Sequence, residues 1–167
     1  IQMPYSGLAP TDYATCTSIN SGSITFFGYP NTASSTTLAS SMQFKVTGNA
    51  ASIAAFGLVA SSPNTIASIL DGTSNTILIC EDAGRPVEYI GSTIKSQTSR
   101  GDGAWLNHEN DYGLDGTISK TSQSGPGNCV INCTNDNETY SFHSGGANIC
   151  FADGSVKFVT QSISIVT

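Results

Sequence analysis

Short runs of β-branched and aromatic residues dominate the pattern of hydrophobic and polar positions along the chain. Such runs predict β-strands, because branched and flat side chains suit a pleated surface. We expect strands over residues 23–29, 41–48, 75–82, 148–153 and 155–166. In the last run, apolar and polar residues alternate within two parts. The alternation shifts register near Gln161, as a bulge or a break in the strand would cause.

Asp153 and Gly154 separate the last two strand-like runs. An Asp-Gly pair favours a two-residue hairpin loop, because a type I′ turn needs positive φ at both of its central residues. The sequence therefore predicts a β-hairpin closed by a type I′ turn.

Helical periodicity is weaker than the strand signal. Residues 49–60 carry apolar side chains near helical spacing behind Asn49, a suitable N-cap. Residues 63–72 predict a second short helix, with Gly72 just past its end. Residues 84–147 are rich in turn-forming pairs and predict long loops.

The chain has 167 residues, with no internal repeat and no low-complexity linker that would mark a boundary. We therefore expect one domain over residues 1–167. The pattern of strands with one or two short helices and long loops predicts the α+β class.

Charge and composition limit the kinds of partner that we expect for this chain. Only 11% of residues are charged, the formal net charge is −6, and the six basic residues are scattered. Binding to nucleic-acid phosphates needs clustered basic residues, so we expect no nucleic-acid partner. The abundance of Ser, Thr, Asn and Gly is typical of extracellular or cell-surface proteins. The longest apolar run is far shorter than the ~20 residues that cross a membrane, so we expect no membrane contact by this fragment.

The spacing of the cysteines is consistent with a protein that is exported from the cell. Cys129 and Cys133 bracket a short loop and predict a disulfide; half of a zinc site is the alternative, although no second ligand pair has suitable spacing. The total of five cysteines leaves at least one thiol free or paired between chains. Cys80 and Cys150 occupy apolar strand positions and are expected to be buried.

His143 raises the question of catalysis. Ser141, Ser144 and Asp153 are close to it in sequence, as a hydrolytic triad would require. No G-x-S-x-G elbow is present, and neighbours along a strand point to opposite faces. We expect no enzyme, and a hydrolase around His143 or His108 is kept as an alternative.

Two loops are rich in oxygen ligands, residues 105–116 and 133–138. Calcium prefers such ligands, which makes calcium a candidate cofactor, although neither loop has the EF-hand pattern. The other interpretation is a set of solvated turn residues. The candidate calcium ligands are Asp111, Asp115, Asp136 and Glu138.

Aromatic residues near the same loops suggest a carbohydrate-binding surface, because flat rings suit sugar rings. Trp105 and Tyr112 are the candidate binding residues. Tyr140 and Phe142 form either a two-ring platform or part of the core.

His143 is followed by nine residues and then by Asp153-Gly154. Three further blocks precede this pattern in order: "PTDYA" (10–14), "DGTSNTILICEDAGRP" (71–86) and "GAW" (103–105). Together with residues 129–159, they resemble the prepilin-like surface proteins that are numerous in planctomycetes. That family carries the prepilin-type processing-associated H-X9-DG C-terminal motif.

The resemblance implies a type IV pilin or type II secretion pseudopilin architecture. In it, a long N-terminal helix precedes a globular head with a central antiparallel β-sheet. That helix is absent before Ile1, so the resemblance implies a pilin-like head without its N-terminal assembly helix. Pro10, Cys80 and Cys150 depart from the residues usual in the family. The signature residues, to which the resemblance gives structural roles, are His143, Gly145, Gly146, Asn148, Asp153, Gly154, Asp71, Gly72 and Asn75.

These observations lead to two functional hypotheses. The first is an extracellular pilin-like or pseudopilin-like subunit, or a surface adhesion domain, that assembles with like subunits. The alternative is a soluble secreted binding module for polysaccharide, with calcium as its candidate cofactor.

Overall fold

The computed structural model describes residues 10–19, 21–26, 66–69, 72–96, 103 and 111–164. The strand expected over 41–48 and the helix expected over 49–60 lie outside these ranges. No helix in the described ranges is both long enough and apolar enough to span a bilayer.

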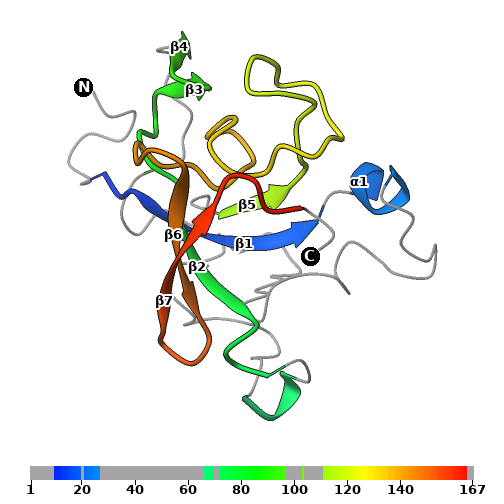
Figure 1. The fold of residues 1–167 in the computed structure, drawn as a ribbon, viewed down its shortest axis with the longest axis vertical. Helices are drawn as coiled ribbons and strands as arrows, with labels where there is room; N and C mark the ends of the chain where they lie inside the picture. The colour runs from blue at the N-terminus through cyan, green and yellow to red at the C-terminus, as the bar shows by residue number, and fades with distance from the viewer. Residues whose placement is uncertain are drawn as a thin grey trace, which may run out of the picture.

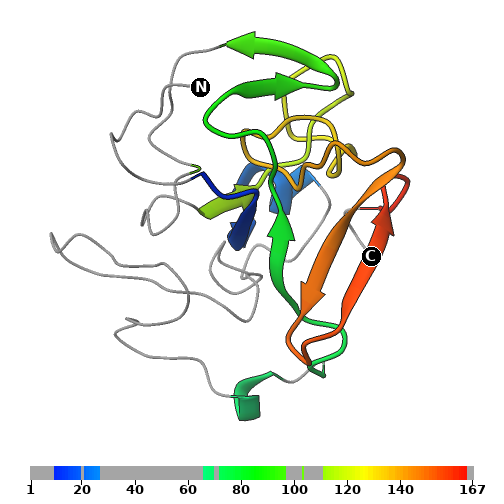
Figure 2. The same cartoon turned by 90° about the vertical axis from the view of Figure 1, so that its left-hand side faces the viewer.

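A five-stranded sheet forms the centre of the molecule, in the order β5-β1-β2-β6-β7 (Figure 1). Neighbouring strands are antiparallel except β1 and β5, which run parallel. A separate two-stranded sheet, β3-β4, lies at the opposite end of the molecule from the β6–β7 turn (Figure 2). The strand bounds are β1 Tyr13–Ile19, β2 Ile77–Glu81, β3 Glu88–Ile90, β4 Thr93–Ser96, β5 Asp111–Leu114, β6 Gly146–Phe151 and β7 Val156–Thr160.

The fold is mostly β, so the expected α+β class is wrong. Helical structure in the described residues is limited to α1 (Ser21–Phe26) and one 3-10 turn, η2 (Ile66–Ser68). The helix expected over 63–72 is only that turn within its described part, and the strand expected over 23–29 begins as α1. The hydroxyl of Ser23 donates to the carbonyl of Asp115, so a distant contact outweighs the weak local preference for a strand.

The sheet is mixed, which corrects the expectation of a wholly antiparallel one. Thr15 pairs with Asp111 and Cys16 with Tyr112 in parallel register. Neither β1 nor β5 was predicted, because β1 is rich in Thr and Ser and β5 is only four residues long. Parallel pairing also needs a long crossover, which leaves no local sequence signal.

The core lies on one face of the sheet. Ala14, Cys80, Tyr112 and Ile149 form one buried cluster there. A second cluster lies beneath the loop between β5 and β6, where Val130 and Ile131 contact Ala147. Cys80 is buried as expected, whereas Cys150 is only half-buried.

The β6–β7 hairpin confirms the last two predicted strands, and β7 ends at Thr160, next to the break expected near Gln161. Its turn differs from the expected type I′. Only Gly154 has positive φ, +83°. The N–H of Gly154 donates to the carbonyl of Phe151, and the N–H of Phe151 donates to that of Ser155. This pattern is a type I turn followed by a glycine bulge, which needs a glycine at one position only.

Candidate functional site

The residues of the H-X9-DG signature lie along one hairpin. His143 and Gly145 are in the loop that leads into β6, Asn148 is within β6, and Asp153 and Gly154 form the turn after it. The six residues of β6 span about 20 Å. His143 and Asp153 therefore lie at opposite ends of the strand and do not share a catalytic or metal site.

Glu81, at the end of β2, links the His143 loop to the sheet. Its carboxylate accepts the backbone N–H of Asn148 at 2.6 Å and the side-chain amide of Asn148 at 3.1 Å. The imidazole Nε2 of His143 lies 3.3 Å from the same carboxylate. The side chain of Glu81 is 9% exposed and that of His143 is 58% exposed. Two signature residues thus meet one nearly buried carboxylate that sequence reasoning had not singled out.

We expect His143→Ala to lower the free energy of unfolding by about 0.5–1 kcal/mol, because the contact between His143 and Glu81 has one exposed partner and is partly screened by solvent. That change corresponds to a melting temperature lower by about 1–4 °C for a chain of this size. Thermal denaturation near pH 6 checks it, with Ser144→Ala as the exposed neighbouring control. Equal melting temperatures for His143→Ala and the native chain would contradict a structural role.

Asn132 fixes the loop that carries His143. It has φ of 60°, and its side-chain amide donates to the carbonyls of His143 and Gly146 at 3.2 and 3.1 Å. Its side-chain oxygen accepts the N–H of Ser141 at 2.8 Å. The Ser141 hydroxyl donates to the Gly146 carbonyl and accepts the N–H of His143, so it serves the backbone. Sequence reasoning missed Asn132; the available signal was an asparagine, tolerant of positive φ, inside the Cys129–Cys133 loop.

Gly146 allows β7 to approach β6 closely. A Cβ at this position would lie 2.2 Å from the carbonyl oxygen of Val159 and 2.8 Å from the ring of Phe158. No side chain fits there, so Gly146 is required by packing at the start of the hairpin.

The second signature turn, residues 72–75, contacts the tip of the same hairpin. The N–H of Asp153 donates to the carbonyl of Thr73 at 3.2 Å, and Lys157 Nζ donates to the carbonyl of Ser74 at 3.1 Å. The N–H of Asn75 donates to the carbonyl of Gly72, which closes the turn. Asp71 lies outside the described residues. Two blocks that are far apart in sequence are therefore one structural unit.

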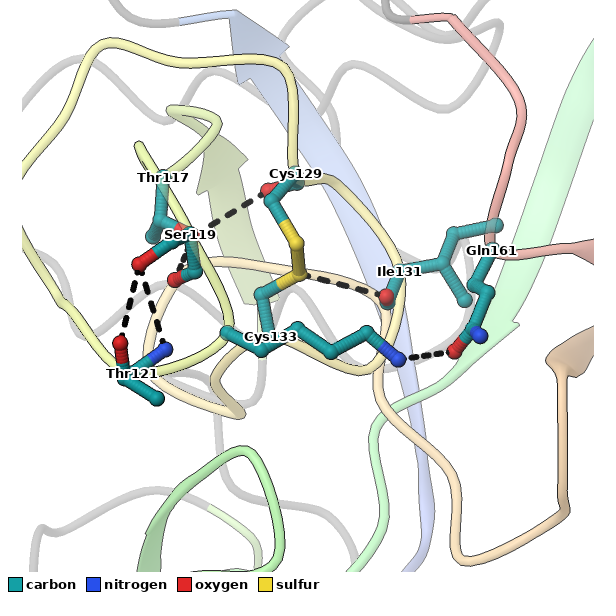
Figure 3. Close-up of a disulfide and its surroundings, with 8 residues drawn as sticks. Thr117, Ser119, Thr121, Cys129, Ile131, Cys133 and Gln161 are labelled. Atoms are coloured by element: carbon teal, nitrogen blue, oxygen red, sulfur yellow. Dashed lines mark hydrogen bonds between the residues drawn. A yellow bond between two sulfur atoms is a disulfide. The ribbon is translucent and has the colours of Figure 1, made fainter.

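The predicted disulfide between Cys129 and Cys133 is present, with Cα atoms 6.0 Å apart (Figure 3). Thr117 and Cys129 exchange two backbone hydrogen bonds of 2.9 Å. The disulfide loop is thereby attached to the segment that follows β5.

Arg85 and Asn135 join the 82–89 segment to the residues that follow the disulfide loop. The guanidinium of Arg85 lies 2.8 Å from the carboxylate of Asp82 and donates to the carbonyls of Asn135 and Asp136. The Asn135 side chain accepts the N–H of Tyr89 and donates to two carbonyls in the 82–89 segment. The side chains of Arg85 and Asp82 are 3% and 0% exposed. This buried polar network is structural.

The candidate calcium ligands do not converge on one point in the described residues. Asp136 lies beside Arg85, whereas Asn137 donates its amide to the carboxylate of Asp115. Glu138 is fully buried, and the backbone groups of Gly116 and Asp115 lie near its carboxylate. Burial, and then the nearby Asp115, raise the pKa of Glu138 to about 9. The side chain of Asp111 lies outside the described part, within which no three His, Cys, Asp or Glu side chains form a metal-binding group.

The aromatic candidates occupy different environments. Tyr112 is 3% exposed and its hydroxyl lies 2.7 Å from that of Thr139, so its ring belongs to the core. Tyr140 is buried, but Phe142 is 63% exposed and contacts it edge to face. Trp105 and His108 lie outside the described residues.

A surface hollow of about 420 Å³ lies beside the His143 loop. One wall is the loop itself, including Phe142 and Gly145, and the other contains Gly91, Lys120 and Gln161. Its volume falls within the range of small-molecule sites, roughly 300–1,000 Å³. Sequence reasoning missed this hollow because its walls come from segments that are distant along the chain.

No curated protein and no solved structure matches the chain significantly. One family model, described as protein of unknown function DUF1559, matches residues 9–165. That match covers nearly the whole chain and includes the signature hairpin, the disulfide loop and the Arg85 segment. The chain belongs to the DUF1559 family.

Proposed function

We propose that the chain is an extracellular pilin-like or pseudopilin-like structural subunit, or surface adhesion domain, that acts by assembly with like subunits and not by catalysis. The observation that carries this proposal is the distribution of the signature residues. They hold backbone segments together along a strand of about 20 Å, and the Ser141 hydroxyl next to His143 is engaged by backbone groups. A subunit that is selected for its shape needs such residues.

The β6–β7 hairpin offers a surface for assembly. Val156 and Phe158 are 64% and 50% exposed, and β7 is an edge strand of the five-stranded sheet. Edge strands have unpaired backbone groups that pair readily with another chain. Lys157, the charged residue in this strand, lies over the ring of Phe151, which leaves the apolar positions accessible. A second copy of this chain is the proposed occupant.

The disulfide supports the proposed location. Disulfides persist in oxidising compartments and are rare in the cytosol. Together with the low content of charged residues, the Cys129–Cys133 bond favours an extracellular or cell-surface protein.

Photo-cross-linking in intact cells that make the protein tests this proposal. A photoreactive amino acid replaces Val156 in the full-length chain, and the matched control replaces Ile94, which is 49% exposed on β4 at the other end of the molecule. Material sheared from the cell surface should contain a cross-linked species of twice the subunit mass for position 156 and little for position 94. Monomer alone at both positions, or retention of the protein inside the cells, would contradict the proposal.

A further inference from the structure

We propose that the hollow beside the His143 loop binds a sugar unit that carries a carboxylate, that is, a uronate. This inference goes beyond assembly, because it assigns a small-ligand site to a different surface from the β6–β7 edge.

Two basic side chains line the hollow, Lys120 and His143, and His143 is engaged by the carboxylate of Glu81. The lysine and arginine side chains that the structure describes are Arg85, Lys95, Lys120 and Lys157. Arg85 and Lys95 form ion pairs, and Lys157 lies over an aromatic ring. Lys120 instead contacts the neutral side-chain amide of Gln161. An ammonium group has three donors, so this contact leaves two for a ligand.

In the part of the chain that the structure describes, no acidic side chain pairs with Lys120, although the net charge of the chain is −6. A chain of net negative charge repels anions as a whole, and the ammonium group of Lys120 offsets this repulsion locally at the hollow. A polyanion would meet repulsion from the rest of the surface, which favours a ligand with a single carboxylate.

The remaining lining suits a sugar ring. The exposed Phe142 offers a flat apolar surface, and the sugar's C–H face can lie against it. Gln161, Ser92 and Ser144 supply hydrogen-bonding groups around the same hollow. An aromatic surface and a ring of neutral polar groups match a ligand with one apolar face and several hydroxyls.

Hydrogen bonds fix the walls of the hollow in the absence of a ligand. The N–H of Gln161 donates to the carbonyl of Gly145 at 2.8 Å, and the N–H of Gly91 donates to that of Cys133 at 2.7 Å. The hydroxyl of Tyr140 donates to the carbonyl of Gly91 at 2.6 Å. A preorganised site avoids the ordering cost of binding.

Titration of the folded chain with matched glycosides tests the inference. The probes are methyl glucuronide and methyl galacturonide, with methyl glucoside and methyl galactoside as neutral counterparts and acetate as the simple anion. Binding is followed by backbone amide shifts. We expect at least one uronide to bind at least tenfold more tightly than its neutral counterpart, with shifts at Gly145 and Gln161. Lys120→Met should weaken that binding at least tenfold, whereas Lys157→Met, which removes another exposed lysine, should leave it unchanged.

Three results would overturn the inference. Equal affinity for the charged and neutral glycosides would remove the role of the carboxylate. Acetate binding as tight as the uronide would reduce the site to a simple anion contact. The third result is that no uronide binds at millimolar concentration while both lysine variants keep the native melting temperature. In that case the hollow does not bind a uronate. None of these results bears on the cross-linking experiment, so the two proposals fail independently.

Discussion

Replacing Arg85 with alanine is expected to lower the free energy of unfolding by about 3–5 kcal/mol. Asp82 and Arg85 are both buried, and their charged groups lie 2.8 Å apart. Removal of the guanidinium leaves a buried carboxylate without its counter-ion and also frees the carbonyls of Asn135 and Asp136. Chemical denaturation of the purified domain measures the change.

The matched control is Lys95→Ala, because Lys95 pairs with Glu88 at 3.2 Å but is 44% exposed. Its effect should be below about 1 kcal/mol. The double substitution Asp82→Asn with Arg85→Met should recover part of the lost stability, because it removes both buried charges. If Arg85→Ala and Lys95→Ala had the same small effect, the buried pair would not stabilise the fold.

A second large effect is expected from Glu138 as the pH changes. Burial raises the pKa of Glu138 from its ordinary value of 4.5 to about 9. Between these values the folded chain keeps this proton and the unfolded chain loses it. The contribution of Glu138 to stability is therefore complete below pH 4.5 and is lost as the pH rises towards 9, at about 1.4 kcal/mol per pH unit.

Glu138→Gln should remove that slope, because the neutral amide resembles the protonated acid and does not titrate. Denaturation curves at pH 4, 6 and 8 should show that the free energy of unfolding of the variant rises, relative to that of the native chain, at each step in pH. Asp153→Asn is the control, since Asp153 is fully exposed and its pKa is lowered by its bonds to Ser155; it should not change the slope above pH 4.5. Parallel slopes for Glu138→Gln and the native chain would contradict a neutral Glu138.

The same experiment tests calcium. Calcium binds a charged carboxylate, so a calcium site at Glu138 would make added calcium stabilise the native chain increasingly at higher pH. The stability of the native chain should instead be the same in calcium and in chelator.

The sequence could predict elements with local signals. β2, β6 and β7 have β-branched and aromatic runs, the Asp153-Gly154 pair marks a turn, and Cys129 and Cys133 are close enough to bond across one loop. Even there, the Asp153-Gly154 pair did not distinguish a type I′ turn from a type I turn with a glycine bulge, because Gly154 suits both turns.

The rest of the fold depends on contacts between distant segments. The parallel pairing of β1 with β5, the burial of Arg85 against Asn135, and the attachment of the His143 loop by Asn132 have no local periodicity. The α+β expectation was wrong because the helix expected over 63–72 is only a 3-10 turn in its described part. Ser23 shows the opposite error, since it lies in a run expected as a strand and folds as part of α1, where its hydroxyl donates to the carbonyl of Asp115. The hollow at Lys120 needs five such segments to be placed first.

The interior position of β1 has a consequence for biosynthesis. This strand precedes the other described strands in sequence but is paired on one side with β2 and on the other with β5. Contacts between distant residues slow folding, and the β1 side of the sheet is incomplete until residue 114 has emerged from the ribosome. Until that point the chain exposes one unpaired edge of β1, which makes this strand the segment that a holding chaperone would protect.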